Sequence, residues 1–131
     1  MPGARRVLKL RRARHHLGVV TSGDRDRVVC QLRLFQLTDL FASHVCSGDT
    51  RCRKPHPAPL RLALRQMSLD PSACVYVGDS PEDLEMARRA GVRPIAVLGP
   101  FPTEARLRAA KPDLLLASIT ELPAALRRLT A

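Results

Sequence analysis

Two carboxylates four residues apart follow a short apolar segment near the middle of the chain. Residues 75–77 (Val-Tyr-Val) predict a β-strand, Gly78 ends it, and Asp79 and Asp83 stand where a helical pattern begins. Ligand sites of open α/β sheets lie at the carboxyl ends of the strands, and carboxylates are suitable oxygen ligands for Mg²⁺. Asp79 is therefore a candidate metal ligand, although Gly-Asp after a strand also forms simple turns.

A hydroxyl-rich segment follows an earlier apolar run. Thr21-Ser22-Gly23 comes directly after residues 17–20, and Asp24 opens a helical pattern. A hydroxyl group and free backbone N–H groups at a helix N-terminus can bind an anion. On its own the segment is more typical of a helix N-cap formed by Ser22 or Thr21. It indicates an anion site only in combination with the other candidate segments.

Lys54 is the third candidate, in a loop with prolines at positions 55, 57 and 59. The chain has three lysines and nineteen arginines, so a lysine in a proline-stiffened loop indicates a placed charge. A lysine can neutralise a phosphoryl oxygen as a point cation. The alternative is an ordinary surface lysine. His56 lies beside it and could line the same site, but an ordinary loop histidine is the favoured interpretation.

The elements that must position these residues alternate regularly along the chain. Helices separate the strands, which indicates βαβ units and a parallel sheet with right-handed crossovers. The expected fold is α/β, a Rossmann-like doubly wound parallel sheet of about five strands, at residues 17–21, 42–46, 73–77, 95–98 and 113–117. Helices are expected at residues 5–14, 24–35 (with Val28, Val29, Leu32 and Phe35 inward), 60–67, 82–90, 103–110 and 121–129.

Taken in order, these three segments resemble a known family. A hydroxyl-Gly after a strand, Lys-Pro-x-Pro before a helix, and then Val-Gly-Asp-Ser-x-x-Asp are similar to the haloacid dehalogenase-like (HAD) hydrolase superfamily. Within it the chain resembles the phosphoglycolate phosphatase-like and β-phosphoglucomutase-like branch, over nearly its whole length. The resemblance implies a Mg²⁺-dependent phosphatase that acts on a small phosphorylated metabolite.

The resemblance also implies roles for individual residues. Thr21, with the backbone N–H groups of Ser22 and Gly23, would bind the transferring phosphoryl group, and Lys54 would stabilise its charge. Asp79 would ligate Mg²⁺. Gly78, Ser80 and Asp83 complete the last motif, and Asp83 would support the lysine and the metal shell.

One part of the family pattern is absent from these 131 residues. The family's chemistry begins at Asp-x-Asp-Gly-Thr, in which the first Asp is the nucleophile and the second is the general acid/base. Asp24-Arg25-Asp26 is the only Asp-x-Asp here, and no Gly-Thr follows it. Acids in a first helical turn offset the helix dipole, and that interpretation is favoured over a nucleophile.

The missing motif would normally lie on a central strand between those at 17–21 and 73–77. The resemblance therefore implies that residues 1–131 are a partial HAD core domain, N-terminally incomplete, without the first strand and the cap. Unpaired strand edges promote association. We expect poor solubility, self-association or completion by an N-terminal segment, and no catalytic activity from this chain alone.

Composition narrows the alternatives. No apolar stretch approaches the roughly 18–20 residues that span a bilayer, so no membrane partner is expected. Four cysteines without a C-x-x-C pair do not indicate a zinc site, and reduced thiols favour a cytoplasmic location. The net charge of +10 raises the possibility of nucleic-acid binding, but no nucleic-acid motif accompanies it, and a solvated basic helix face is favoured.

Two further functions stay open at this point. Thr21, Lys54 and Asp79 could hold phosphate and Mg²⁺ without turnover, as a non-catalytic binding module. An Arg-rich nucleic-acid-binding domain is the less favoured alternative, and it requires a steep salt dependence of binding. A receiver domain would need an acidic pair at the end of the first strand, which the sequence lacks.

Overall fold

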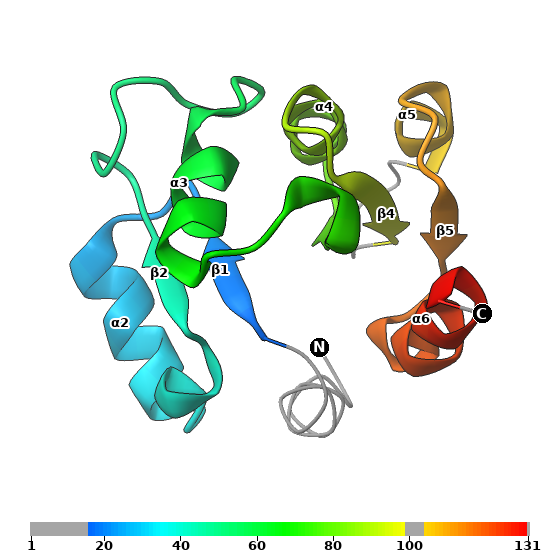
Figure 1. The fold of residues 1–131 in the computed structure, drawn as a ribbon. Helices are drawn as coiled ribbons and strands as arrows, with labels where there is room; N and C mark the ends of the chain where they lie inside the picture. Colours follow the sequence, from blue (N-terminus) through cyan, green and yellow to red (C-terminus); the bar gives the residue numbers. More distant parts are fainter. Residues whose placement is uncertain (1–15, 99–103, 131) are drawn as a thin grey trace.

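The computed structural model describes residues 16–98 and 104–130, and Figure 1 shows their arrangement. The strands are β1 (Gly18–Val20), β2 (Ser43–Val45), β3 (Val75–Gly78), β4 (Arg93–Val97) and β5 (Leu114–Leu116). The helices are α2 (Arg25–Leu34), α3 (Ala58–Met67), α4 (Pro81–Arg89), α5 (Glu104–Ala109) and α6 (Leu122–Thr130). Short 3-10 turns lie at Thr38–Leu40, Pro71–Ala73 and Ile119–Glu121. The helix expected at residues 5–14 lies outside the described residues.

All five expected strands are present, and every strand pair is parallel. The observed ranges differ from the expected ones by one or two residues, and two of the differences are informative. Residues 71–73 form a 3-10 turn, with Asp70 accepting a hydrogen bond from the Ser72 amide, so β3 starts only at Val75. β4 starts earlier than expected, at Arg93. Pro94 does not prevent this, because it lies near the start of the strand, where a missing N–H is tolerated, and its carbonyl accepts a hydrogen bond from the Asp113 amide at 2.9 Å.

Helices cover both faces of the β3–β4–β5 sheet. Successive side chains of a strand point to opposite faces: Ile95 and Val97 pack with α6, while Ala96 packs with Leu84 of α4 and Leu107 of α5. In Figure 1, α4 and α5 lie above this sheet and α6 below it. The fold is therefore the doubly wound α/β arrangement that the sequence predicted.

Helix α2 differs from the expected pattern at one residue. No residue of α2 is fully buried, and Phe35 directly after it is 60% exposed. The expectation that Phe35 points inward was wrong. Helix α2 ends at Leu34, and Phe35 takes the C-cap position, so the helical periodicity no longer directs its ring.

The described strands form two separate sheets. β1 pairs with β2, and β3, β4 and β5 pair in that order, but β1 and β3 do not pair with each other. One apolar cluster connects the two sheets, because Val20 and Val45 pack with Leu60 and Leu64 of α3 and with Met86 of α4. The strands at 17–21 and 73–77 thus flank a break in the sheet, as expected from the sequence.

None of the helices among the described residues has the length and apolar character needed to cross a membrane.

The facing edges of β1 and β3 lead to the first prediction. We expect the 131-residue chain to self-associate, because β1 and β3 each have an edge with no strand partner among the described residues, and such edges pair readily with another chain. Sedimentation velocity over a range of concentrations should show species heavier than the 14.5 kDa monomer. A monomer at all concentrations, with a sharp thermal transition, would contradict this expectation.

Candidate functional site

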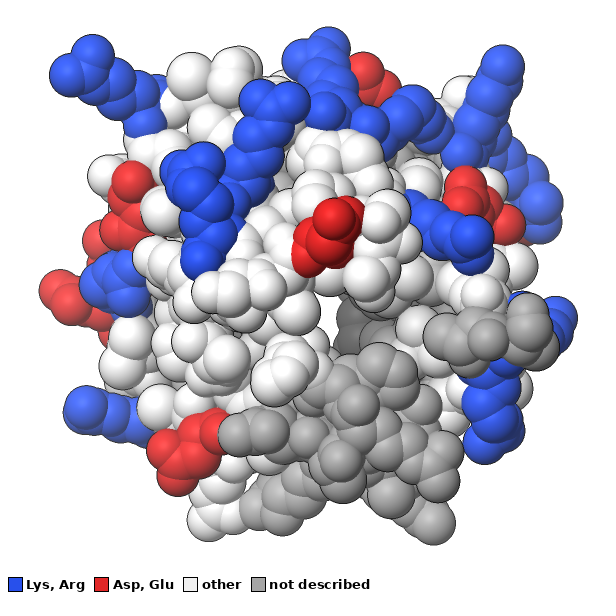
Figure 2. Space-filling view, viewed as in Figure 1, with Lys and Arg blue, Asp and Glu red and all other residues white. Residues whose placement is uncertain are grey.

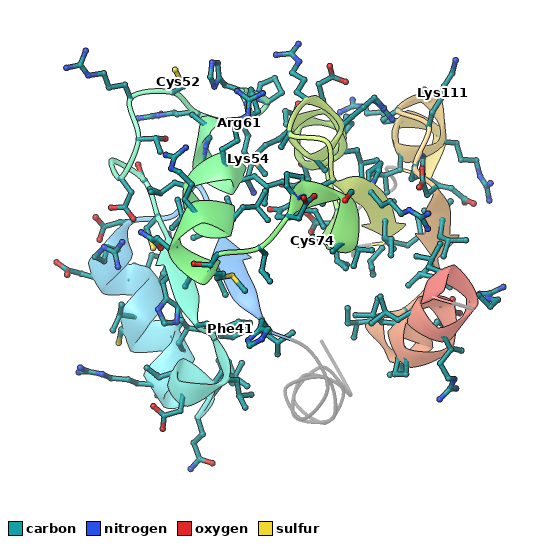
Figure 3. All side chains as sticks on the ribbon, viewed as in Figure 1. Phe41, Cys52, Lys54, Arg61, Cys74 and Lys111 are labelled. Atoms are coloured by element: carbon teal, nitrogen blue, oxygen red, sulfur yellow. The ribbon has the colours of Figure 1, made fainter. Side chains whose placement is uncertain are left out.

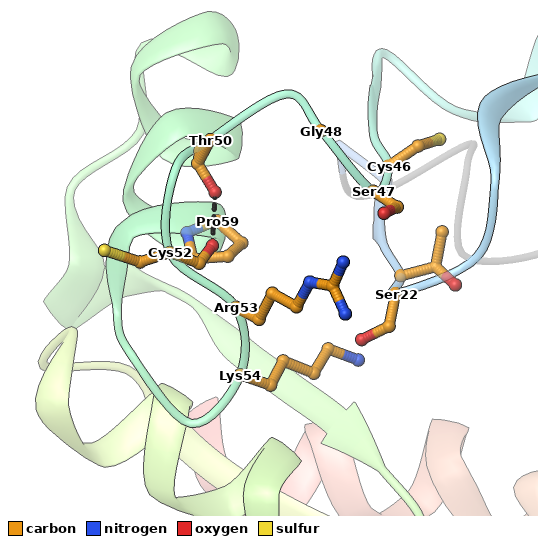
Figure 4. Close-up of a pocket in the computed structure, with 10 residues that line it drawn as sticks. Ser22, Cys46, Ser47, Gly48, Thr50, Cys52, Arg53, Lys54 and Pro59 are labelled. Carbon is orange, nitrogen blue, oxygen red and sulfur yellow. Dashed lines mark hydrogen bonds between the residues drawn. The ribbon is translucent and has the colours of Figure 1, made fainter.

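Three segments that are far apart in the sequence meet at the carboxyl ends of β1, β2 and β3. Thr21 follows β1, Cys46 follows β2, and Asp79 follows β3. A pocket at this edge is drawn in Figure 4. It is lined by residues that follow β1 and β2 and by the loop before α3: Thr21, Ser22, Cys46, Ser47, Gly48, Thr50, Cys52, Arg53, Lys54 and Pro59.

Backbone hydrogen bonds fix the segment after β1. The Thr21 amide donates to the Val45 carbonyl at 2.9 Å, and the Thr21 hydroxyl accepts a hydrogen bond from the Gly23 amide at 3.1 Å. The N-cap of α2 is Asp24, whose carboxylate accepts from the Arg27 amide. The alternative that Ser22 or Thr21 is the N-cap is therefore wrong, and both residues line the pocket instead.

Asp24 and Asp26 lie at the start of α2, where the favoured interpretation of the Asp-x-Asp pair places them. Asp24 caps α2, and Asp26 lies in its first turn. Carboxylates at these positions interact favourably with the positive end of the helix dipole. Neither is among the residues that line the pocket.

Lys54 is not a surface lysine. Its Nζ lies 2.6 Å from Oδ1 of Asp83, and the two side chains are 16% and 8% exposed. The ammonium group also lies 5.7 Å from the centre of the Tyr76 ring, within the range of a cation–π interaction. Figure 3 shows Lys54 between α3 and the strand–helix unit of β3 and α4. The lysine thus links the loop before α3 to the start of α4.

The start of α4 is built to hold Asp83. Ser80 is the N-cap and accepts a hydrogen bond from the Asp83 amide at 3.2 Å. Oδ2 of Asp83 accepts one from the Asp79 amide, also at 3.2 Å. A Cβ at position 78 would lie 2.7 Å from Cγ of Asp83, so glycine is required there. Gly78 and Ser80 therefore position Asp83, which in turn holds Lys54.

Asp79 is exposed, directly follows β3 and is not among the residues that line the pocket. Its amide is bonded to Asp83, whereas its carboxylate makes no hydrogen bond or ion pair that involves the described residues. These residues contain no group of three or more His, Cys, Asp or Glu side chains that could hold a metal. Mg²⁺ is commonly bound by one or two carboxylates together with water and phosphate, so a single free Asp79 carboxylate fits that ion.

His56 has a structural role. Its Nδ1 accepts a hydrogen bond from the Ala58 amide at 3.0 Å, at the first residue of α3. This satisfies a backbone donor that the helix leaves free. His56 does not line the pocket, in agreement with the favoured interpretation of the sequence.

In the sequence, Tyr76 is recognisable only as part of the expected strand at 73–77. Its hydroxyl donates to the Val20 carbonyl at 3.0 Å and lies 3.5 Å from Oδ1 of Asp83. Burial, together with the negative charge of Asp83, raises the pKa of the Tyr76 phenol far above its ordinary value. The phenol therefore stays protonated and connects β3 to β1. The only sign of a special role in the sequence is that Tyr76 is the single tyrosine of the chain.

A second feature missed in the sequence is the pair of Arg25 and Asp49. The two side chains form an ion pair. Oδ2 of Asp49 also accepts a hydrogen bond from the Cys46 amide at 2.8 Å, and the Arg25 guanidinium donates one to the His44 carbonyl at 3.0 Å. These contacts hold the loop after β2 against the start of α2. The partners are 24 residues apart, so no local pattern indicated them.

The Lys54–Asp83 pair leads to the second prediction. Lys54→Met leaves a buried carboxylate without its cation, and we expect a loss of roughly 3 kcal/mol in the free energy of unfolding. Asp83→Asn should also destabilise the protein, and the double variant should lose less than the sum of the two. Urea denaturation of the four proteins gives the coupling free energy.

Arg108 and Glu104 provide the matched control. They form an ion pair with side chains 65% and 53% exposed, so Arg108→Met should cost less than about 1 kcal/mol. Equal losses in the free energy of unfolding for Lys54→Met and Arg108→Met would show that the buried Lys54–Asp83 pair contributes no more than an exposed pair.

The third prediction uses the single tyrosine. The pKa of Tyr76 is raised in the folded protein, so the folded state keeps a proton that the unfolded chain loses above about pH 10. Tyr76 should therefore not affect the free energy of unfolding below pH 10, where it is protonated in both states. Above pH 10 the free energy of unfolding should fall as the pH rises. Alkaline titration should give no tyrosinate absorbance until the circular dichroism of the fold is lost.

Tyr76→Phe is the control for this titration. It should remove the part of the decline in stability above pH 10 that comes from the tyrosine. Tyrosinate absorbance near pH 10 in a protein that is still folded would contradict the prediction.

Comparisons with known proteins agree with this geometry. The model of the haloacid dehalogenase-like hydrolase family matches residues 1–97. The pyrophosphatase PpaX of Bacillus velezensis is 33% identical over 114 residues, which cover 87% of this chain and 53% of the relative. The chain thus spans about half the length of the curated relatives it matches.

Solved structures give the same assignment. CbbY from Rhodobacter sphaeroides, solved in complex with phosphate, is 31% identical with a TM-score of 0.83, over 92% of this chain and 55% of CbbY. A predicted phosphoglycolate phosphatase from Haemophilus somnus is 25% identical with a TM-score of 0.85, over 95% of this chain and 56% of that one. With the family model matched over most of the sequence, the chain belongs to the haloacid dehalogenase-like hydrolases.

Proposed function

We propose that residues 1–131 form a partial core domain that binds the phosphoryl group and Mg²⁺ in a phosphatase of small organic phosphate monoesters. One observation carries this proposal: the hydroxyl segment after β1 and the lysine of the loop before α3 meet in a single pocket. Phosphoryl transfer depends mainly on positioning and on neutralising charge, and these residues are suited to both tasks.

Each residue has a part in the proposed function. The Thr21 hydroxyl and the amides of Ser22 and Gly23 bind phosphoryl oxygens, and Lys54 is held beside them by Asp83 at 2.6 Å. The carboxylate of Asp79 is the group that would hold Mg²⁺. When bound, Mg²⁺ neutralises developing charge on phosphate oxygens.

The covalent step needs a residue that these 131 residues do not contain. In the family the first aspartate of Asp-x-Asp-Gly-Thr attacks the phosphorus: its oxygen bonds to phosphorus as the bond to the leaving alcohol oxygen breaks, and the second aspartate protonates that oxygen. Water, deprotonated by the same second aspartate, then hydrolyses the acyl phosphate to aspartate and inorganic phosphate. That motif is absent here. We therefore expect the 131-residue chain to bind phosphate without hydrolysing the ester, as the non-catalytic binding alternative also requires.

The substrate class is proposed from the relatives. One relative is named a pyrophosphatase and a structural neighbour a phosphoglycolate phosphatase. A phosphoglycolate-like monoester remains our proposed substrate, and pyrophosphate belongs in the same tests. The four cysteines are unpaired, and we propose a cytoplasmic location because such thiols suit a reducing compartment.

The nucleic-acid alternative has less support. Figure 2 shows Lys and Arg side chains spread around the visible face, with other residues between them. Several arginines are paired within the described part, among them Arg88 and Arg89 with Glu85. A binding surface for a nucleic-acid backbone normally clusters basic residues on one face.

The fourth prediction tests phosphate and Mg²⁺ binding. Isothermal titration of the 131-residue chain with inorganic phosphate should show binding that Mg²⁺ strengthens, because the ion and the anion neutralise each other in the site. Asp79→Asn should remove the effect of Mg²⁺ and leave binding without Mg²⁺ largely unchanged.

Asp113→Asn is the matched control, because Asp113 is also exposed but precedes β5, at the opposite end of the parallel sheet. Absence of phosphate binding would overturn the proposal. Mg²⁺-dependent hydrolysis of phosphoglycolate or pyrophosphate that Asp79→Asn abolishes would overturn the expected inactivity, and Asp24 would then be tested as the nucleophile.

A further inference from the structure

The pocket contains a second cation next to Lys54. Arg53 lies in its wall, and Figure 4 shows the Arg53 guanidinium beside the Lys54 ammonium, both directed toward Ser22. In the sequence, only the lysine is distinguished, because arginine is common in this chain. Two adjacent residues of one loop thus extend into the same pocket with positive charge.

The two cations differ in how far they are neutralised. The charge of Lys54 is balanced by Asp83 at 2.6 Å. The guanidinium of Arg53 forms no ion pair or hydrogen bond with the described residues, and no Asp or Glu lines the pocket. The uncompensated positive charge of the pocket therefore comes from Arg53.

The chemistry of the two side chains also differs. A lysine ammonium acts as a point charge, whereas the planar guanidinium of arginine matches two oxygens of a carboxylate or phosphate at once. If Thr21, Ser22 and Lys54 bind a single phosphoryl group, the Arg53 guanidinium is still available to bind another anion.

We propose that Arg53 binds a second anionic group of the substrate, next to the phosphoryl group that is removed. This inference rests on the proposed function of the pocket and adds a substrate class to it. The substrate carries two anionic groups a few bonds apart, a chemistry that pyrophosphate and phosphoglycolate share. Esters of neutral alcohols lack the second group and gain nothing from Arg53.

The test compares three ligands on the 131-residue chain by isothermal titration at one fixed salt concentration: inorganic phosphate, pyrophosphate and 2-phosphoglycolate. In Arg53→Gln the affinities for pyrophosphate and 2-phosphoglycolate should fall by about tenfold, the loss expected for one charge-assisted contact. The affinity for inorganic phosphate should change by less than about twofold, because Arg53 is not expected to contact this smaller ligand directly and an exposed charge acts only weakly at a distance.

Arg51→Gln is the matched control, because it removes the same charge from the same loop at a residue outside the pocket wall. It should leave all three affinities nearly unchanged. Arg53→Lys keeps the charge without the fork and should give intermediate affinities for the two larger ligands.

Three results would overturn the inference. Equal losses for all three ligands in Arg53→Gln would show general attraction only, and equal effects of Arg51→Gln would show that position is irrelevant. In both cases phosphate binding, and with it the proposed function, would stand. If the unaltered chain bound none of the ligands, the proposed function and this inference would fail together.

Discussion

The ion pair between Lys54 and Asp83 is the interaction on which the site depends. Two charges withdrawn from water are costly unless each has a close partner and further hydrogen bonds. Asp83 meets that condition through Lys54 and the Asp79 amide, with the Tyr76 hydroxyl nearby. The loop before α3, the end of β3 and the start of α4 are thus held together at one point, and the binding residues are placed before any ligand arrives.

Much of this arrangement could be predicted from the sequence because its signals are local. Thr21, Lys54 and Asp79 each follow a strand or precede a helix, and parallel strands bring their carboxyl ends to one edge. Even the support of Lys54 by Asp83, implied by the resemblance to the HAD superfamily, is an ion pair in the structure. The chemical roles of these residues remain predictions.

The remainder could not be predicted because it depends on distance in space rather than along the chain. Tyr76 reaches Val20 across 56 residues, and nothing in an alternating strand pattern distinguishes it from a core residue. Arg53 is one of nineteen arginines, and only the course of the loop brings it into the pocket. The expected inward position of Phe35 failed because periodicity says nothing about the residue that ends a helix.

The bond from Tyr76 to Val20 has a consequence for any strand that pairs with the free edge of β1. The amide of Thr21 faces β2, so the neighbouring Val20 carbonyl faces the other way, toward the break in the sheet. A carbonyl oxygen can accept two hydrogen bonds, so an incoming strand that bonds to this carbonyl either shares it with the Tyr76 hydroxyl or displaces that hydroxyl, which lies beside Asp83. If the hydroxyl is displaced, strand pairing at β1 alters the surroundings of Asp83, and the resulting coupling between strand pairing and anion binding is the same in both directions.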